Sequence, residues 1–387
     1  MMNRTTEPTV AILELLAERP RASRSELVAA TGLSAATVGR AVARLRRHGL
    51  LREVPLDATG VGRPPRIVEL ADRAAFVVGI DAGGRTLRAA IASLGGQLGT
   101  RIARPVRDAT DPDALLDDLV ALVDALAESV GPGTIQAVVA GISGIVDHAN
   151  GRVLLSPDLP GLNGIPVAAR LATRLELPAA VDNDDLLAAI GEAAAGAAIG
   201  CRDVVFLSLG YGLGAGLIVG GRPVRGASHA AGAIAYLGPG RLDERASGRA
   251  IPQRYRELAP DRPGPGVADA RQVFELAEAG DRTAILVISE VVGSLGDLAV
   301  DVAALLDPEV IVVGGGLADA GTALFGPLEA RLHAVLPYPP RLVPSALEDA
   351  AVLHGAVSVA LGLARRRLAG IASAPGSESE RPALALL

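Results

Sequence analysis

The stretch FVVGIDAGGRTLRAAIASLGGQL, residues 76–98, decides the fold of the larger part of this chain. An apolar run ends in a glycine turn and a second apolar run follows, which is the pattern of two strands joined by a tight turn. The layout returns in VVFLSLGYGLGAGLIVGGRPV, residues 204–224, and a third glycine turn follows the apolar run in PEVIVVGGGLADAG, residues 308–321. Two similar units in one chain predict an α/β fold of two related lobes.

The glycine turns also indicate an ancestral function, because glycine lets backbone N–H groups approach an anion closely. Each turn alone could be a plain connection between strands. The three together favour a cleft descended from a nucleotide site, whose loop residues would be Asp81, Gly83, Gly84, Gly212, Gly214 and Gly315.

Composition excludes several classes of protein. The single cysteine, Cys201, excludes an internal disulfide and a zinc site built from several thiolates. The first residues lack the apolar segment of a signal peptide, and we find no run of about 18 uncharged apolar residues that would predict a membrane span. We therefore expect a cytoplasmic protein with no membrane partner.

Charge is unevenly distributed along the 387 residues, whose formal net charge is −6. Residues 19–66 hold ten arginines against three acidic residues, a local charge of +7, which leaves −13 for the remainder. A basic head on an acidic body predicts a polyanion-binding module at the N-terminus. On charge alone, a solvated helix surface is the alternative.

The head reads as a helix-turn-helix in SRSELVAATGLSAATVGRAVARLRRHGLLREV, residues 23–54. Ser23 or Ser25 would cap a short helix, a glycine would make the turn, and Ser34 would cap a second helix with apolar residues on one face. Residues 10–16 would supply the supporting helix. Helix, short turn and helix in this order predict a DNA-binding unit.

A β-hairpin wing is expected after the second helix, with DATGVGRPPR, residues 57–66, at its turn. The start of the second helix would face base edges, while arginines near its end and in the wing would contact phosphates or the minor groove. A helical bundle for protein contacts is the alternative, but it would not need the wing. The predicted DNA-binding residues are Ser34, Ala35, Thr37, Val38, Arg40, Arg44, Arg47, Arg63 and Arg66.

Six motifs, in order along the chain, resemble those of the regulator branch of the ROK family (repressor, open reading frame, kinase). They are GVGRPP, GIDAGGRT, GISGIVDHANGRV, VDNDDLLAAIGE, GYGLGAGLIVGG and DPEVIVVGGG, and the resemblance runs from Thr9 to about Arg367. It implies a winged helix-turn-helix followed by a two-lobed actin/hexokinase-like (ribonuclease H-like) fold. It also implies a homodimer or homotetramer that binds operator DNA and a sugar or sugar phosphate effector.

The resemblance also predicts domain boundaries. The winged helix-turn-helix would cover 8–72 and the ROK domain 75–370, followed by a disordered tail at 371–387. Within the ROK domain, lobe 1 would cover about 75–185 and lobe 2 about 186–350, and a C-terminal helix would return to lobe 1.

The resemblance places the effector site around Asn183 and Asp184. In sugar-binding relatives this pair holds sugar hydroxyls and the aspartate is the kinase base. Here Asp184 is a candidate for a relic of that base, a ligand contact or a helix cap, and the sequence leaves these open; Glu192 would help or only pack. The predicted effector-binding residues are Gly141, Ser143, Gly144, Asn183, Asp184, His229, Ala233 and Tyr236.

Three departures from the family pattern argue against catalysis. Ala233 and Tyr236 stand where relatives have a hydroxyl-binding glutamate and a zinc-binding histidine, and GPGRLDERASG, residues 238–248, has none of the usual zinc-loop cysteines. Arg85 occupies a threonine position in the first phosphate loop, where it would fill the phosphate space, pair with an anion, or bridge to Asp81 or Asp184. We therefore expect no catalytic residue, no zinc and no ATP requirement.

The sequence thus predicts a transcriptional regulator, a repressor of the ROK family, with a kinase-like domain that senses a sugar derivative and forms the oligomer. The first alternative is a ROK sugar kinase that carries a DNA-binding head. The second is a constitutive DNA-binding protein without an effector.

Overall fold

The computed structural model describes residues 7–55, 66–131, 133–238, 241–260 and 267–373. The predicted wing turn, with Arg63, and most of the predicted tail lie outside these residues. The chain divides into two compact units. Unit 1 consists of Met1–Ala140, Leu159–Val181 and Ala356–Leu387, and unit 2 consists of Gly141–Asp158 and Asp182–Gly355.

The N-terminal head, part of unit 1, is a helix-turn-helix with a small antiparallel sheet, as predicted. Ser23 forms a capping box with Glu26, Ser34 accepts a hydrogen bond from the Thr37 N–H, and Gly32 makes the turn at a φ of 68°. Its helices are α1 (Pro8–Glu18), α2 (Arg24–Thr31) and α3 (Ala35–Arg47). Its strands β1 (Arg21–Ser23), β2 (Leu51–Pro55) and β3 (Arg66–Leu70) lie in the order β1-β3-β2.

The core of the head includes part of the last helix of the chain, α12 (Ala351–Ser373). Leu368 and Ala369 of α12 belong to the same cluster of buried side chains as Leu45 of α3. The Ser373 hydroxyl at the end of α12 also donates a hydrogen bond to Glu7, just before α1. Within unit 1, the start of the described head at Glu7 and the C-terminal part of α12 are therefore packed together.

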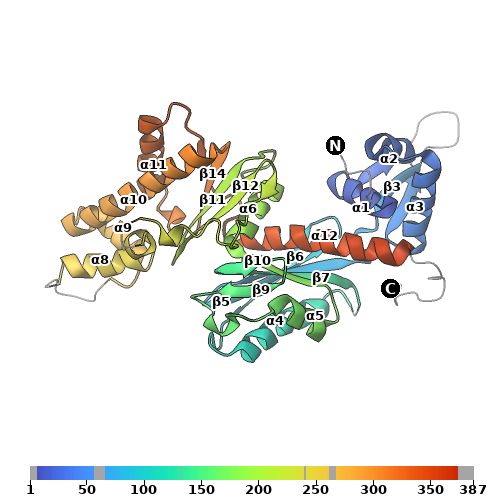
Figure 1. Cartoon of the computed structure of the whole chain (residues 1–387), viewed down its shortest axis with the longest axis horizontal. Coiled ribbons are helices and arrows are strands. Elements are labelled where there is room, and N and C mark those ends of the chain that lie inside the picture. The colour runs from blue at the N-terminus through green and yellow to red at the C-terminus, as the bar shows by residue number, and fades with distance from the viewer. Residues whose placement is uncertain (1–6, 56–65, 132, 239–240, 261–266, 374–387) are drawn as a thin grey trace. The chain divides into compact units, whose positions relative to one another are not determined.

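The remainder of unit 1 is a mixed sheet covered by helices, in the strand order β10-β7-β4-β5-β6. In Figure 1, α4 and α5 lie together on one side of this sheet. The strands are β4 (Phe76–Ala82), β5 (Thr86–Ser93), β6 (Leu98–Pro105), β7 (Ile135–Ile142) and β10 (Ala179–Asn183), and β7 and β10 run on into unit 2. The α-helices are α4 (Pro112–Ala127) and α5 (Val167–Leu175), with the short η1 (Asp72–Ala74) and η2 (Pro160–Leu162).

Unit 2 contains a second mixed sheet, in the order β13-β12-β11-β14-β15, which confirms the predicted repetition of sheet units. Its strands are β11 (Val204–Leu209), β12 (Leu213–Val219), β13 (Arg222–Pro223), β14 (Val310–Gly314) and β15 (Arg341–Pro344). A separate hairpin pairs β8 (Ile145–Asp147) with β9 (Arg152–Leu155). The larger helices are α6 (Asp184–Ala195), α8 (Ala250–Leu258), α9 (Ala270–Glu278), α10 (Arg282–Leu306) and α11 (Thr322–Val335). Short helices are η3 (Ile234–Tyr236), α7 (Asp243–Ala246), η4 (Ala318–Ala320) and η5 (Glu348–Ala350).

Glycines allow α6 to pack closely on β12 and α12. A Cβ on Gly216 of β12 would lie 2.1 Å from the carbonyl oxygen of Asp185, and a Cβ on Gly355 of α12 would lie 1.8 Å from that of Leu187. Neither position can take a larger side chain unless the backbone moves. This packing fixes α6, whose N-terminus carries the Asn183–Asp184 motif.

Among the described residues, α10 is long and apolar enough to cross a membrane, by length and composition alone. The same helix supplies many buried residues to the core of unit 2, among them Val287, Val291 and Leu295. Core helices of globular domains pass the same test, so this feature gives weak evidence for a membrane span.

Candidate functional site

The second helix of the head, α3, presents an exposed surface that carries arginines. Ala35, Arg40, Arg44 and Arg47 are exposed, whereas Thr37 is half-buried. One predicted residue is corrected, because Val38 is 1% exposed and packs in the core of the head rather than toward DNA. Exposed and buried residues alternate along α3 because the helix is amphipathic, and residues three or four apart lie on the same face.

The hydroxyls near the start of α3 are partly engaged within the head. The Ser34 hydroxyl caps the helix and lies 2.9 Å from the Thr37 hydroxyl. Arg40 donates to the Thr37 hydroxyl at 3.4 Å. This long contact engages the Arg40 guanidinium, which is exposed.

Several other arginines of the head are held by buried carboxylates. Glu53 of β2, whose side chain is 5% exposed, pairs with Arg24, Arg46 and Arg66. Burial alone would raise the pKa of Glu53, but the hydrogen bond from Arg24 and the charges of the three arginines hold that pKa below its usual value. Arg66 was predicted to face DNA; its guanidinium is 3.4 Å from Glu53, and this contact joins β3 to β2.

In unit 2, the predicted effector site is organised by Asn183, the last residue of β10. Its Oδ1 accepts a hydrogen bond from the Leu186 N–H at 2.8 Å, so Asn183 is the N-cap of α6. Its Nδ2 donates to the carbonyl oxygen of Gly144 at 2.9 Å and to the carboxylate of Asp184 at 3.1 Å. Asn183 therefore joins α6 to the turn between β7 and β8.

Asp184 is the first residue of α6 rather than its cap. Its carboxylate accepts hydrogen bonds from the Asn183 amide and from the Asp185 N–H, the latter at 3.0 Å. A carboxylate in the first turn is favourable because the N-terminus of a helix carries partial positive charge. The capping role considered for Asp184 belongs to its neighbour, and the role of Asp184 toward a ligand stays a prediction.

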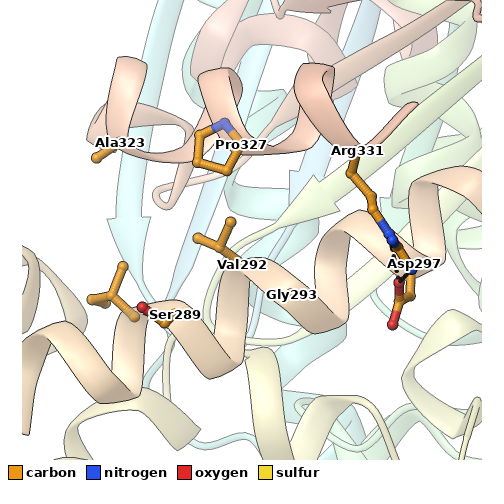
Figure 2. A pocket seen from close by; sticks show the side chains of 8 residues that line it. Ser289, Val292, Gly293, Asp297, Ala323, Pro327 and Arg331 are labelled. Carbon is orange, nitrogen blue, oxygen red and sulfur yellow. Dashed lines mark hydrogen bonds and ion pairs between the residues drawn. The ribbon is translucent and has the colours of Figure 1, made fainter. Parts of the chain in front are cut away.

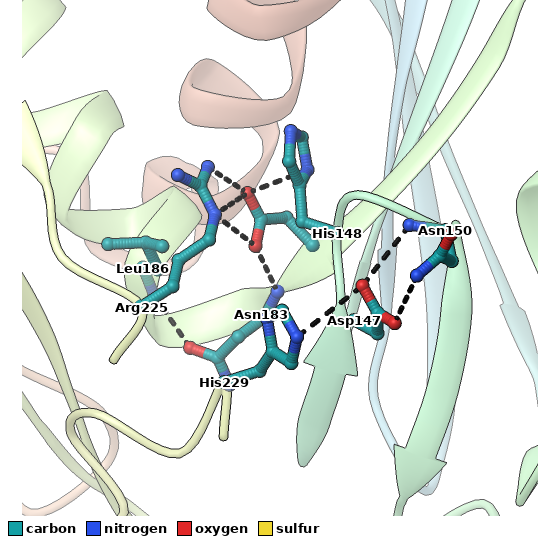
Figure 3. A network of polar contacts seen from close by, with 8 residues as sticks. Asp147, His148, Asn150, Asn183, Leu186, Arg225 and His229 are labelled. Carbon is teal, nitrogen blue, oxygen red and sulfur yellow. Dashed lines mark hydrogen bonds and ion pairs between the residues drawn. The ribbon is translucent and has the colours of Figure 1, made fainter. Parts of the chain in front are cut away.

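Two pairs of histidine and aspartate lie beside Asn183 (Figure 3). His229 Nε2 is 3.5 Å from Asp147 on the β8–β9 hairpin, and His148 Nδ1 is 3.3 Å from Asp182. Hydrogen bonds from the side chain and backbone of Asn150, followed by the charge of His229, lower the pKa of Asp147. These contacts join the segment that bears His229 to the hairpin.

Asp182 is the most enclosed of these carboxylates. It is 1% exposed, accepts hydrogen bonds from the Nε and Nη2 of Arg225 and also accepts one from the backbone N–H of Asn183. A buried carboxylate requires such partners, since an unpaired charge in the interior is costly. Asp182 and Arg225 thus anchor the segment leading to His229, which itself adopts a left-handed φ of 59°.

The other predicted effector residues have mixed roles. Ser143 donates to Asp158 at 3.1 Å. A Cβ on Gly141 would lie 2.7 Å from Val352, and one on Gly144 would lie 2.1 Å from the carbonyl oxygen of Leu155, so both glycines serve close packing. Glu192 is fully buried, accepts hydrogen bonds from Ser345 and backbone N–H groups, and serves packing.

The described part of the segment expected in place of the zinc loop is held by apolar and π contacts and by polar contacts of Asp243 with the Leu213 N–H and Arg249. Leu242 is 4% exposed and belongs to the core of unit 2, and the Arg241 guanidinium lies 5.1 Å from the centre of the Tyr236 ring. The described residues contain no group of three or more histidine, cysteine, aspartate or glutamate side chains suited to a metal. The donors of this segment do not fit zinc, and the absence of zinc in solution stays a prediction.

The glycine turns have structural functions that their sequences did not reveal. In the β4–β5 turn of unit 1 the Gly83 N–H donates to the Thr86 carbonyl, and Asp81 pairs with Arg88 at 3.1 Å. In unit 2, a Cβ on Gly214 would overlap the carboxylate of Asp185. A Cβ on Gly212 would lie 3.5 Å from Asp243, and one on Gly315 would lie 2.6 Å from the carbonyl oxygen of Leu209.

Two known families match this chain, one in the head and one in the body. The pattern of the IclR helix-turn-helix domain matches residues 7–55, and that of the ROK family matches residues 77–362. This chain belongs to the ROK family. The predicted fold class, a winged helix-turn-helix joined to a ROK sugar-kinase-like domain, is confirmed.

The relatives of this chain include both kinases and repressors. Glucokinase of Thermotoga maritima is 29% identical over 66% of this chain and 86% of its own length. The xylose repressor of Caldicellulosiruptor bescii is 23% identical over 90% of this chain and 94% of its own length. A solved ROK family transcriptional regulator, a homologue of the E. coli Mlc protein, has the same fold at 21% identity, with a TM-score of 0.81 over 95% of this chain and 98% of its own. The chain is thus similar both to regulators and to kinases, and the similarity to regulators extends over the head.

Sequence reasoning missed the carboxylates and cations that surround Asn183. Asp147 and His148 lie inside a quoted motif, and Asp182 directly precedes Asn183, but none of them was selected. Arg225 pairs with Asp182, which lies 43 residues earlier in the sequence. The spacing of residues within a motif cannot predict a contact over that separation. The signal available was the density of polar residues in VDHAN, residues 146–150, within an otherwise apolar region.

Proposed function

We propose that this ROK protein is a DNA-binding transcriptional repressor whose ROK domain senses a sugar or sugar phosphate. The observation that carries the proposal is the presence of an exposed, arginine-bearing recognition helix and a ROK domain in one chain. The similarity to a xylose repressor over 90% of this chain supports the same arrangement. The protein would act in the cytoplasm.

The operator contacts would come from α3 and the wing. Ala35 allows close approach to base edges, Arg40 reads a base, and Arg44 and Arg47 neutralise phosphates. Two heads in a homodimer or homotetramer would bind the two halves of a pseudo-palindromic site.

The effector would be bound in unit 2 by Asn183, Asp184 and His229. An amide, a carboxylate and an imidazole supply both donors and acceptors, which suits a ligand rich in hydroxyl groups. Ala233 and Tyr236 would leave the remaining contacts more apolar than a hydroxyl-binding glutamate would. The effector regulates DNA binding only by its differential affinity for the binding and non-binding states.

Selection of genomic DNA fragments by the purified protein tests the regulator function. We expect enrichment of a two-fold-symmetric site, and Arg40→Ala should weaken binding to that site by about 1–3 kcal/mol if Arg40 contacts a base. Arg271→Ala removes the same charge from an exposed position of the body and is the matched control. Equal loss on random DNA would assign Arg40 to phosphate, and no enrichment with the wild-type protein would refute the proposal.

A thermal-shift screen with sugars and sugar phosphates tests the effector. A ligand of the folded state raises the unfolding temperature, and Asn183→Ala should abolish that rise. If a broad screen gives no shift while operator binding persists, the protein binds DNA constitutively.

A sugar kinase that also carries a DNA-binding head is the second candidate, favoured by the retained Asp184 and by 29% identity to a glucokinase. It predicts sugar-dependent consumption of ATP that disappears in Asp184→Asn. Our proposal predicts no such consumption and requires neither ATP nor zinc. Turnover by the wild-type protein that Asp184→Asn abolishes would establish the kinase.

A further inference from the structure

Two surfaces of the described residues differ in the cations that they offer to DNA. A groove of about 610 Å³ between α10 and α11 of unit 2 is lined mostly by small and apolar side chains (Figure 2). Its one arginine, Arg331, is paired with Asp297 at 2.8 Å, so the described lining of the groove offers phosphates no unpaired cation. Helix α3 of the head, in contrast, exposes Arg40 and Arg44. The chemistry of DNA recognition therefore lies on α3.

Helical geometry divides α3 into a buried face and an exposed face. Successive residues of an α-helix are rotated by about 100° around its axis. Val38 and Leu45 are buried in the core of the head and mark the inner face. Ala36 and Arg44 each lie four residues from Arg40, so these three exposed residues form one stripe on the outer face.

The two exposed alanines at the start of α3 are not equivalent. Ala36 is rotated by only about 40° from Arg40 around the helix axis, whereas Ala35 is rotated by about 140°. Ala36 therefore shares the arginine-bearing stripe, and Ala35 lies on the flank of the helix. The N-terminal residues of a recognition helix contact base edges, and on this stripe the residue in that position is Ala36.

The polar groups next to Ala36 are engaged with one another. The Ser34 hydroxyl accepts a hydrogen bond from the Thr37 N–H at 3.2 Å and lies 2.9 Å from the Thr37 hydroxyl. The Thr37 hydroxyl also accepts a hydrogen bond from Arg40 at 3.4 Å. What Ala36 itself presents to a partner is a methyl group. In the major groove, the apolar group that a methyl contacts is the C5 methyl of thymine.

We propose that Ala36 is a specificity-determining residue that recognises the C5 methyl group of a thymine in each half of the operator. This role rests on the proposed binding of operator DNA by α3. Four residues of an α-helix rise by about 6 Å, which is close to two base-pair steps of about 3.4 Å. The thymine therefore lies within about two base pairs of the base that Arg40 contacts.

Replacing thymine by deoxyuridine tests the contact, because only the methyl group is removed. In synthetic duplexes of the site enriched from genomic DNA, each thymine is replaced in turn, and affinity is measured by fluorescence anisotropy at fixed salt. Loss of one methyl from an apolar contact should weaken wild-type binding about fourfold, and the same replacement in both half-sites about fifteenfold. If no thymine responds, the proposal is wrong.

Ala36→Gly removes the methyl group on the side of the protein. This variant should bind the thymine and deoxyuridine duplexes equally at the responding position. Ala35→Gly is the matched control, because it places glycine in the same exposed turn and shares any loss of helix stability, yet should keep the wild-type preference for thymine. An unchanged preference in Ala36→Gly, or a lost preference in Ala35→Gly, would overturn the assignment to Ala36.

The same experiments separate this proposal from the proposed function. A wild-type protein that enriches no DNA site refutes the regulator function itself. A wild-type protein that binds its enriched site with equal affinity for every thymine and deoxyuridine duplex is still a DNA-binding protein, and only the role of Ala36 is refuted.

Discussion

Replacing Asn183 separates its structural contacts from its predicted contact with the effector. Asn183→Ser keeps a side-chain oxygen for the N-cap but loses the amide donations to the Gly144 carbonyl and the Asp184 carboxylate, while Asn183→Ala loses all three hydrogen bonds. A neutral hydrogen bond contributes about 0.5–1.5 kcal/mol and an N-cap about 1 kcal/mol. We expect losses of about 1 kcal/mol for the serine variant and about 2 kcal/mol for the alanine variant.

Amide hydrogen exchange measures the cap directly, because the Leu186 N–H is the group that Asn183 caps. A difference of about 1 kcal/mol corresponds to about fivefold in the opening equilibrium. Exchange at Leu186 should therefore be about fivefold faster in Asn183→Ala than in Asn183→Ser. Amides in the last turn of α6 should be equally protected in both variants and provide the internal control.

Equal exchange at Leu186 in the two variants would refute the assignment of Asn183 as a stabilising cap. The same pair then isolates the role of Asn183 in binding. If both variants fail to bind an effector that stabilises the wild type, the amide group itself contacts the ligand. If serine restores binding, the contribution of Asn183 is to hold the N-terminus of α6 in place.

Further outcomes concern the head and the metal content. Leu45→Ala, at a fully buried position of α3, should destabilise the head by about 2–5 kcal/mol in hydrogen exchange, whereas the exposed Arg44→Ala should change it by less than about 0.5 kcal/mol. Because ion pairs lower the pKa of Glu53, its stabilising contribution is present above the usual glutamate pKa and is lost as pH falls through the lowered value. Glu53→Gln should therefore reduce the acid sensitivity of the head in urea unfolding at a series of pH values, and an unchanged profile would contradict this. Metal analysis of the purified protein should find no stoichiometric zinc; one zinc per chain would show that the segment around Tyr236 binds it.

The elements of the head were predictable because their signals are local. Ser34 and the glycine turn set the ends of the helices, and the apolar period of α3 set its buried face. The same period should have assigned Val38 inward, since Val38, Val42 and Leu45 lie on one stripe and all are buried. The small residues at the start of α3 favour placing the neighbouring Val38 toward DNA, but the helical period places it in the core, where it lies.

The region of the predicted effector site was predictable only in part, because its geometry depends on contacts between distant segments. The sequence located Asn183 and Asp184 through their motif. It did not reveal that His229 would reach Asp147, or that Arg225 would pair with Asp182, since these pairs join segments more than 40 residues apart. Motifs identify residues along the sequence, whereas pairs such as these depend on how distant segments of the chain pack together.

The number of arginines in the head likewise does not show which of them are paired within the protein. The local charge of +7 predicts that the head binds a polyanion, but it does not say which cations are available. Glu53 holds Arg24, Arg46 and Arg66, and Glu69, 5% exposed, holds Arg21 and Arg52. These five arginines fix β1, β2 and β3 to one another and to the helices. DNA affinity should therefore depend more on Arg40 and Arg44 than on the total charge, and the steepness of its salt dependence should correspond to fewer phosphates than ten arginines would suggest.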